Sequence, residues 1–127
     1  MRIIGIGVDI VETARIEQSV ARHGDRFLDR LFTADERRYC DSMSVPARCY
    51  AARFAAKEAV SKAFGTGIGA DIEWLDIVVL RSPEGKPSIE LRGAGQRLAE
   101  RLGVNEVMLS MSHSDHYAVA QVVACGG

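Results

Sequence analysis

Asp9, Glu58 and Lys62 are the residues of this sequence whose types and spacing best suit chemistry on a phosphate group. Glu58 and Lys62 lie four positions apart, which places them on one face if their segment is helical. Magnesium sites commonly use one or two protein carboxylates and complete the coordination with water and substrate phosphates. The pattern therefore predicts a magnesium and phosphate site. On spacing alone, a solvent-exposed ion pair between Glu58 and Lys62 is the simpler interpretation.

The glycine-rich segment GTGIG at residues 65–69 directly follows this cationic stretch and favours the phosphate interpretation. Glycines let backbone N–H groups approach an anion closely, although Gly65 could equally be an ordinary helix cap. The segment is not a P-loop, because no Gly-Lys-Ser/Thr follows it. The stretch GIGVDI at residues 5–10 is not a dinucleotide fingerprint, because Ile10 stands where the third glycine belongs. Known nucleotide motifs therefore do not account for the site.

A glycine-dotted strand and an alanine-rich helix must position these residues. At period two, the N-terminal β-branched segment places Gly5 and Gly7 on the same face as Asp9. Glycines inside a strand often mark the close approach of another backbone. The strongest predicted helix covers residues 47–64, and its many alanines leave space beside Glu58. We therefore expect this helix to pack on the strand and to bring Glu58 near Asp9.

The rest of the pattern predicts a single domain, residues 1–127, with further helices and two β-hairpins. A Thr-x-x-Glu capping box starts at Thr33, and glycines stand where two of the helices should end. The other helices are expected at residues 12–22, 33–42 and 94–102. The hairpins are expected to pair residues 76–81 with 87–91, and residues 107–112 with 117–124.

Composition excludes several classes of protein. The 127 residues fit one domain, and 47% hydrophobic with 26% charged residues is an ordinary globular mixture. With 16 basic and 17 acidic residues, no overall charge draws the chain to nucleic acid. The N-terminus does not resemble a signal peptide, and no apolar stretch reaches the ~18 residues of a membrane span. We therefore expect a soluble, cytoplasmic protein without a nucleic-acid or membrane partner.

The three cysteines are odd in number and lack both Cys-x-x-Cys spacing and histidine partners at zinc-ligand intervals. This pattern argues against disulfides and against a structural zinc site. We expect Cys40, Cys49 and Cys125 to be reduced, buried packing residues, none of which acts as a nucleophile.

Three separated blocks of the sequence resemble the holo-acyl-carrier-protein synthases, the short bacterial type of 4′-phosphopantetheinyl transferase. The blocks are GIGVDIVE at residues 5–12, RFAAKEA with KA and GTGIG within residues 53–69, and SMSH with YA within residues 110–118. The resemblance implies an α+β fold of the 4′-phosphopantetheinyl transferase type, with an antiparallel sheet, a long central helix and smaller helices. It also implies a homotrimer with active sites between subunits.

The resemblance further implies transfer of the phosphopantetheine arm of coenzyme A to a serine of apo acyl carrier protein. Adenosine 3′,5′-bisphosphate would be released, and Mg²⁺ would be required. Asp9 and Glu58 would hold the metal, which neutralises charge on the phosphate oxygens, while Glu58 and Lys62 would be catalytic. The base for the serine is left open between Glu58, a metal-bound water and a carboxylate from Asp35 or Glu36.

The resemblance also assigns two groups of binding residues. Coenzyme A would contact Arg53, Lys62, Gly65, Gly67 and His113. The acidic carrier protein would contact Arg15, Arg22 and Arg26. The alternative for His113 is a buried, hydrogen-bonded histidine of the core, and the alternative for the arginines is a solvated helix face.

Two other functions stay open. A nonenzymatic carrier-binding module could keep the fold, but it would have no need of Asp9, Glu58 and Lys62. A Mg²⁺-dependent hydrolase of nucleotide pyrophosphates would use similar ligands with water as the acceptor, and it would release bisphosphate without any carrier protein.

Overall fold

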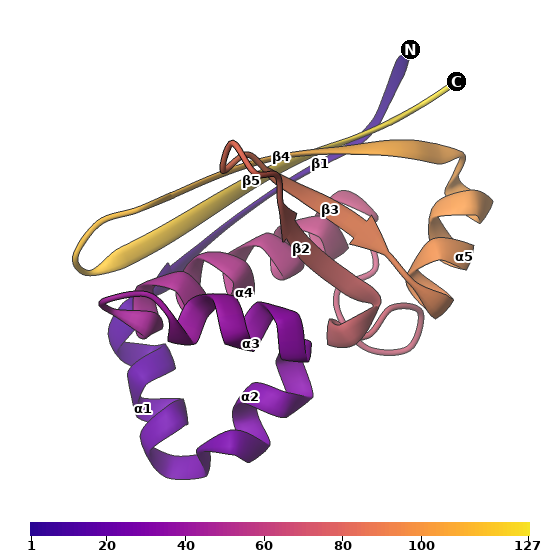
Figure 1. Cartoon of the computed structure of the whole chain (residues 1–127). Coiled ribbons are helices and arrows are strands. Elements are labelled where there is room, and N and C mark those ends of the chain that lie inside the picture. The colour runs from indigo at the N-terminus through magenta and orange to yellow at the C-terminus, as the bar shows by residue number, and fades with distance from the viewer.

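The computed structural model describes the whole chain, residues 1–127. A strand, four helices, a short 3-10 turn, a hairpin, a fifth helix and a second hairpin follow one another (Figure 1). Their bounds are β1 (Arg2–Glu12), α1 (Thr13–His23), α2 (Asp25–Leu31), α3 (Ala34–Asp41), α4 (Pro46–Ala63), η1 (Trp74–Asp76), β2 (Ile77–Arg81), β3 (Pro87–Leu91), α5 (Gly93–Leu102), β4 (Val104–His113) and β5 (Tyr117–Gly126). No helix is both long enough and apolar enough to cross a membrane.

The sheet and the central helix form two packed layers. The strands β1, β5 and β4 make an antiparallel sheet in that order, and β2 with β3 makes a separate antiparallel pair. The helix α4 packs mainly on β1 and β5, and the smaller helices α1, α2 and α3 gather on the side of α4 away from the sheet (Figure 1). This α+β arrangement confirms the expected antiparallel sheet with a long central helix.

The close approach of α4 to β1 depends on small residues on both elements. A Cβ atom added to Gly5 would lie 1.9 Å from the Ala63 carbonyl oxygen, and one added to Gly7 would lie 2.0 Å from the Ala59 carbonyl oxygen. Both alanines are buried. Larger side chains here would push the helix off the strand. The predicted pairing of glycine-dotted strand and alanine-rich helix is therefore confirmed.

The predicted helices and hairpins are all present, but one helix was not predicted. The capping box forms as expected: the Thr33 backbone N–H donates to Glu36 at 2.8 Å, and the Glu36 N–H donates to the Thr33 hydroxyl at 3.2 Å. The additional helix is α2, which starts directly after the cap of α1 at Gly24. Its seven residues bury only Leu28 and Leu31, too short a pattern to reveal a helical period.

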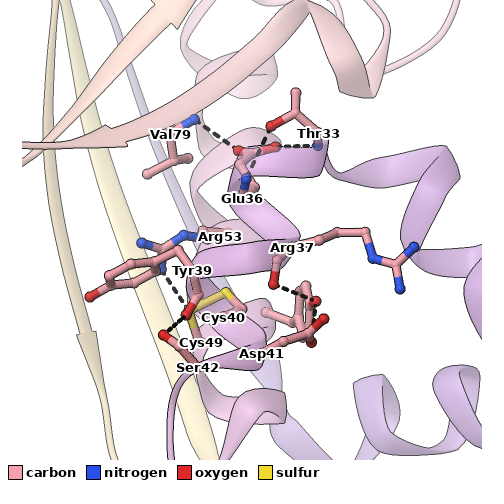
Figure 2. Close-up of a disulfide and its surroundings, with 11 residues drawn as sticks. Thr33, Glu36, Arg37, Tyr39, Cys40, Asp41, Ser42, Cys49, Arg53 and Val79 are labelled. Carbon is pink, nitrogen blue, oxygen red and sulfur yellow. Dashed lines mark hydrogen bonds between the residues drawn. A yellow bond between two sulfur atoms is a disulfide. The ribbon is translucent and has the colours of Figure 1, made fainter.

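The prediction that all three cysteines are reduced is wrong. Cys40, near the end of α3, and Cys49, in the first turns of α4, form a disulfide (Figure 2). The turn between the helices brings their Cα atoms to 5.3 Å, a normal separation for a disulfide that no spacing rule signals. Cys125 is free and buried, as expected.

Candidate functional site

The first candidate site lies where the end of β1 meets α4. Lys62 Nζ donates hydrogen bonds to Asp9 Oδ1 at 2.9 Å and to the Val8 carbonyl oxygen at 3.1 Å. Lys62 forms an ion pair with Asp9 and none with Glu58. The interpretation of Glu58 and Lys62 as a simple surface pair is therefore wrong, because the packing of α4 on β1 gives Lys62 a partner on the strand.

Glu58 completes this cluster. Asp9, Glu58 and Lys62 line one cavity of about 350 Å³, which we call the carboxylate cavity. Burial raises the pKa of the half-buried Glu58, the negative charge of Asp9 raises it further, and Lys62 opposes the shift. The negative charge of Asp9 thus disfavours the charged form of Glu58. A further cation beside them would relieve that repulsion.

The donor set of the carboxylate cavity fits Mg²⁺. The chain contains no group of three or more histidine, cysteine, aspartate and glutamate side chains that could hold a metal by itself. Asp9 and Glu58 offer two carboxylates, which is the usual protein share of a magnesium site that is completed by water and substrate phosphates. The cavity is therefore suited to a metal that arrives with a phosphorylated substrate.

A second cleft, of about 610 Å³, is lined by basic side chains from three elements. Arg48 and Arg53 come from α4, Arg81 from β2, and His113 from the end of β4. No acidic side chain lines this arginine cleft, so it suits a ligand with several negative charges. His113 is exposed in it and makes no hydrogen bond through its side chain. The alternative of a buried core histidine is therefore wrong.

The two sites lie on different faces of α4. Phe54, Glu58 and Lys62 line the carboxylate cavity, whereas Arg48 and Arg53 line the arginine cleft. The two sets of lining residues do not overlap. One chain thus presents the carboxylate cavity and the arginine cleft on separate faces of α4.

Comparison with known proteins decides the family. The family model described as 4′-phosphopantetheinyl transferase superfamily matches residues 5–122. A holo-[acyl-carrier-protein] synthase of Koribacter versatilis (strain Ellin345) is 48% identical over 121 residues, 95% of this chain and 97% of the relative. The chain belongs to the 4′-phosphopantetheinyl transferase superfamily, among the holo-acyl-carrier-protein synthases. The expected resemblance and enzyme class are thereby confirmed.

Solved structures of synthases share the fold. The Helicobacter pylori holo-[acyl-carrier-protein] synthase in complex with coenzyme A has a TM-score of 0.85 at 36% identity, covering 94% of this chain and 99% of that chain. The Bacillus anthracis synthase in complex with CoA (3′,5′-ADP) has a TM-score of 0.83 at 40% identity and covers both chains completely. The expected 4′-phosphopantetheinyl transferase fold is confirmed.

In this transferase, Arg53 is almost entirely buried at the wall of the arginine cleft. Its Nη1 donates to the Cys49 sulfur at 3.1 Å, and its guanidinium lies over the ring of Tyr39 (Figure 2). The disulfide and Tyr39 therefore fix the position of Arg53. Its expected contact with coenzyme A stays a prediction that this location favours.

The predicted coenzyme A residues Gly65 and Gly67 follow the end of α4. Both have positive φ values, 79° and 67°, which glycine adopts at low cost. The Gly65 N–H donates to the Lys62 carbonyl, and the Gly67 N–H donates to the Ser61 carbonyl. These backbone donors therefore cap the helix rather than point free toward an anion. A contact between either glycine and coenzyme A stays a prediction.

The three arginines predicted to bind the carrier protein are exposed on α1 and α2. Arg15 lines the carboxylate cavity beside Glu58 and Lys62. Arg22 and Arg26 line neither site. Arg15 thus lies where it could contact both a bound carrier protein and the cavity. The carrier-binding roles of all three arginines stay predictions.

Lys57 belongs to the core, although it is the immediate neighbour of Glu58 on α4. Its Nζ is fully buried and donates to Glu36 Oε1 at 2.8 Å and to the Leu31 carbonyl oxygen at 2.7 Å. Burial lowers the pKa of Lys57, and the charge of Glu36 opposes this shift. Glu36 also accepts from the backbone N–H groups of Thr33 and Val79. The candidate role of Glu36 as a base for the serine is therefore wrong, because its carboxylate is occupied in the core.

Three residues of the arginine cleft were missed by the sequence interpretation. Arg48 forms an ion pair with Asp115 at 3.3 Å, and Arg81 and Tyr39 meet at the cleft wall. They come from different elements, and only the packing of α3, β2 and the β4–β5 hairpin around α4 brings them together. These basic residues are far apart in the sequence, so their spacing could not predict that they gather near His113.

Proposed function

We propose that this enzyme transfers the 4′-phosphopantetheine arm of coenzyme A to a serine of apo acyl carrier protein, with Mg²⁺ and with release of adenosine 3′,5′-bisphosphate. The observation that carries the proposal is the convergence of Asp9, Glu58 and Lys62 in one cavity. Similar synthases that are described in complex with coenzyme A support this substrate.

The reaction exchanges one phosphorus–oxygen bond for another. The serine oxygen bonds to the phosphorus that carries the pantetheine arm, and the bond from that phosphorus to the bridging oxygen breaks. Adenosine 3′,5′-bisphosphate leaves with the bridging oxygen. Lys62 would contact the pyrophosphate and stabilise the negative charge on the leaving oxygen. When bound by Asp9 and Glu58, Mg²⁺ would neutralise charge on the same phosphates.

We propose Glu58 as the base that takes the serine proton. Asp35 forms an ion pair with Arg38, and Glu36 is held in the core, so neither lines the carboxylate cavity. Glu58 does line this cavity, so its carboxylate is placed to take a proton from a serine bound there.

We propose further that the nucleotide end of coenzyme A occupies the arginine cleft of a neighbouring subunit, near Arg53 and His113. The separate positions of the two sites on α4 support this division. The sheet face opposite α4 also carries strongly exposed apolar side chains on β1: Ile6 at 66%, Val8 at 57% and Ile10 at 65%. Such a patch is typical of a surface that another subunit covers, and it supports the expected homotrimer.

The carrier protein is proposed to dock over α1, where Arg15 borders the carboxylate cavity. An acidic partner would be attracted to the exposed arginines of α1 and α2. Docking there would bring the acceptor serine to Asp9 and Glu58, because Arg15 and both carboxylates line one cavity.

The test is the intact mass of an apo acyl carrier protein after incubation with the enzyme, coenzyme A and Mg²⁺. A chelator and a sample without carrier protein serve as controls, and released bisphosphate is measured in each. A gain of one phosphopantetheine group that the chelator abolishes is the expected result. Bisphosphate without a mass gain would instead indicate a hydrolase, and neither product with several apo carriers would favour a binding module.

A further inference from the structure

The ring of Tyr39 lies close to two guanidinium groups of the arginine cleft. The Cζ atom of Arg53 is 4.7 Å from the ring centroid, and the Cζ atom of Arg81 is 5.2 Å from it. The three residues belong to α3, α4 and β2, and all three line the cleft. Figure 2 shows the Tyr39 ring beside the Arg53 guanidinium. One aromatic ring therefore joins two cations that come from separate elements.

Neither guanidinium has an acidic partner, since no ion pair of the chain includes Arg53 or Arg81. Arg53 is only 3% exposed, and its Nε has no hydrogen-bond partner. Burial lowers the pKa of Arg53, Tyr39 opposes this shift, and the charge of Arg81 adds to it. A buried charge without an ion-pair partner is costly, so an anion in the cleft beside Arg53 and the exposed Arg81 would offset the cost at Arg53.

The two guanidinium groups repel each other, and without a shared contact the exposed Arg81 would turn toward solvent. The negative face of an aromatic ring attracts cations within about 6 Å of its centroid. We infer that Tyr39 is a positioning residue of the arginine cleft: its ring holds Arg53 and Arg81 together so that both face one phosphate group of coenzyme A. This inference rests on the proposed function, which assigns coenzyme A to the cleft.

Three variants separate the ring from other features of Tyr39. Tyr39→Leu removes the ring, whereas Tyr39→Phe keeps it and removes the hydroxyl. Tyr50→Phe is the matched control, because the Tyr50 hydroxyl donates to Asp41 and its ring packs on Phe32 rather than on an arginine. Steady-state kinetics with coenzyme A and apo carrier protein give kcat and the KM of each substrate. Thermal unfolding reports on the fold.

The KM for coenzyme A should rise about tenfold in Tyr39→Leu and change less than about twofold in Tyr39→Phe and Tyr50→Phe. The kcat and the KM for carrier protein should stay within about twofold in all three, because the ring touches neither the acceptor nor the carboxylate cavity. An unchanged KM for coenzyme A in Tyr39→Leu would overturn the inference. So would an equal rise in Tyr39→Phe, or an equal rise for both substrates.

Arg81→Leu keeps the test decisive if Tyr39→Leu does not fold. It should raise the KM for coenzyme A and leave the KM for carrier protein unchanged, and an unchanged KM for coenzyme A would overturn the inference. Where both variants fold, Tyr39→Leu should have a smaller effect in the Arg81→Leu background than in the wild type, because the two residues act through one contact. Additive effects would contradict a shared role.

Calorimetric titration with coenzyme A alone separates this inference from the proposed function. If the wild type binds coenzyme A but transfers nothing to any carrier, the proposed function fails, while weaker binding in Tyr39→Leu than in Tyr39→Phe still supports the role of Tyr39. If the wild type does not bind coenzyme A, the inference falls as well.

Discussion

Lys57 and Lys62 lie five positions apart on α4 and serve opposite purposes. Lys57 is fully buried, and its ammonium group contacts Glu36 and two backbone carbonyls. Lys62 is half-exposed, and its ammonium group joins Asp9 at the rim of a cavity. All hydrogen bonds of the Lys57 ammonium group go to groups inside the protein, whereas Lys62 could leave Asp9 to bind a ligand in the cavity. The same residue type on one helix thus supports the fold at Lys57 and, in the function proposed above, the reaction at Lys62.

The two lysines differ in their partners and not in their charge, and the same difference separates Glu36 from Glu58. Glu36 is buried, and its oxygens accept from Lys57, Thr33 and Val79, so its carboxylate is enclosed in the core away from any ligand. Glu58 has no such set of donors, and burial together with Asp9 raises its pKa. Charged side chains that lack hydrogen-bond or ion-pair partners are common at functional sites, because a bound substrate or metal supplies the missing partner.

The largest predicted effect on stability tests the structural lysine. Lys57→Met leaves the buried charge of Glu36 without its counter-ion, and breaking a buried pair costs about 3–5 kcal/mol of the free energy of unfolding. Lys62→Met is the matched variant and should cost less than about 1 kcal/mol, because its pair is partly exposed. Chemical denaturation measures both. Equal losses in the two variants would remove the distinction between the lysines.

The disulfide between α3 and α4, the helices that the Glu36–Lys57 pair also joins, should have the next largest effect on stability. The disulfide closes a short loop between Cys40 and Cys49, nine positions apart. In the chain-entropy model, its loss in the Cys40→Ser/Cys49→Ser variant costs about 2–3 kcal/mol of the free energy of unfolding. Denaturation without reductant should reveal this loss, and reductant should bring the wild type to the same value. A wild type that is insensitive to reductant, with no loss in the variant, would contradict a stabilising disulfide.

The smallest effect concerns the rim of the carboxylate cavity. Arg15→Glu reverses an exposed charge beside Glu58, so the KM for carrier protein should rise roughly fivefold at low salt and the KM for coenzyme A should stay constant. The difference should shrink as salt is added, because exposed charges are screened. Arg97→Glu on α5 is the control, since it makes the same charge change away from both sites. An unchanged rate for Arg15→Glu at low salt would rule out this docking role.

The local pattern of the sequence predicted the framework that brings the carboxylates together. Alternation in the first strand placed Gly5, Gly7 and Asp9 on one face, and small residues on both sides allowed α4 to approach. These features depend on near neighbours in the chain. They therefore could be predicted without knowing the rest of the fold.

The features that could not be predicted depend on contacts between distant segments. Glu36 and Lys57 are 21 positions apart, and only the packing of α3 on α4 makes them partners. The pairing of Cys40 with Cys49 depends on the angle of the turn between the same helices. Tyr39 acquires its role from Arg81 on β2, far along the chain. Residue spacing carries little information about such contacts, because each one depends on how two separate elements pack against each other.

The raised pKa of Glu58 predicts how its substitution changes the stability of the chain. Because its pKa is raised in the folded chain, its charged form destabilises the metal-free protein at neutral pH. Glu58→Gln should therefore raise the melting temperature slightly at neutral pH, and this gain should vanish as the pH falls until the wild-type carboxyl is protonated. If Glu58→Gln is folded and slightly more stable than the wild type, a loss of its turnover cannot be attributed to unfolding.

The most direct test is the rate at which Glu58→Gln adds the phosphopantetheine arm to apo carrier protein, followed by intact mass beside the wild type with saturating Mg²⁺. We expect a loss of at least about a hundredfold with the fold intact, because a proposed metal ligand and the proposed base are removed together. Tyr50→Phe serves as a folded control outside the cavity. Wild-type turnover by Glu58→Gln would contradict the assignment of the carboxylate cavity as the site of transfer.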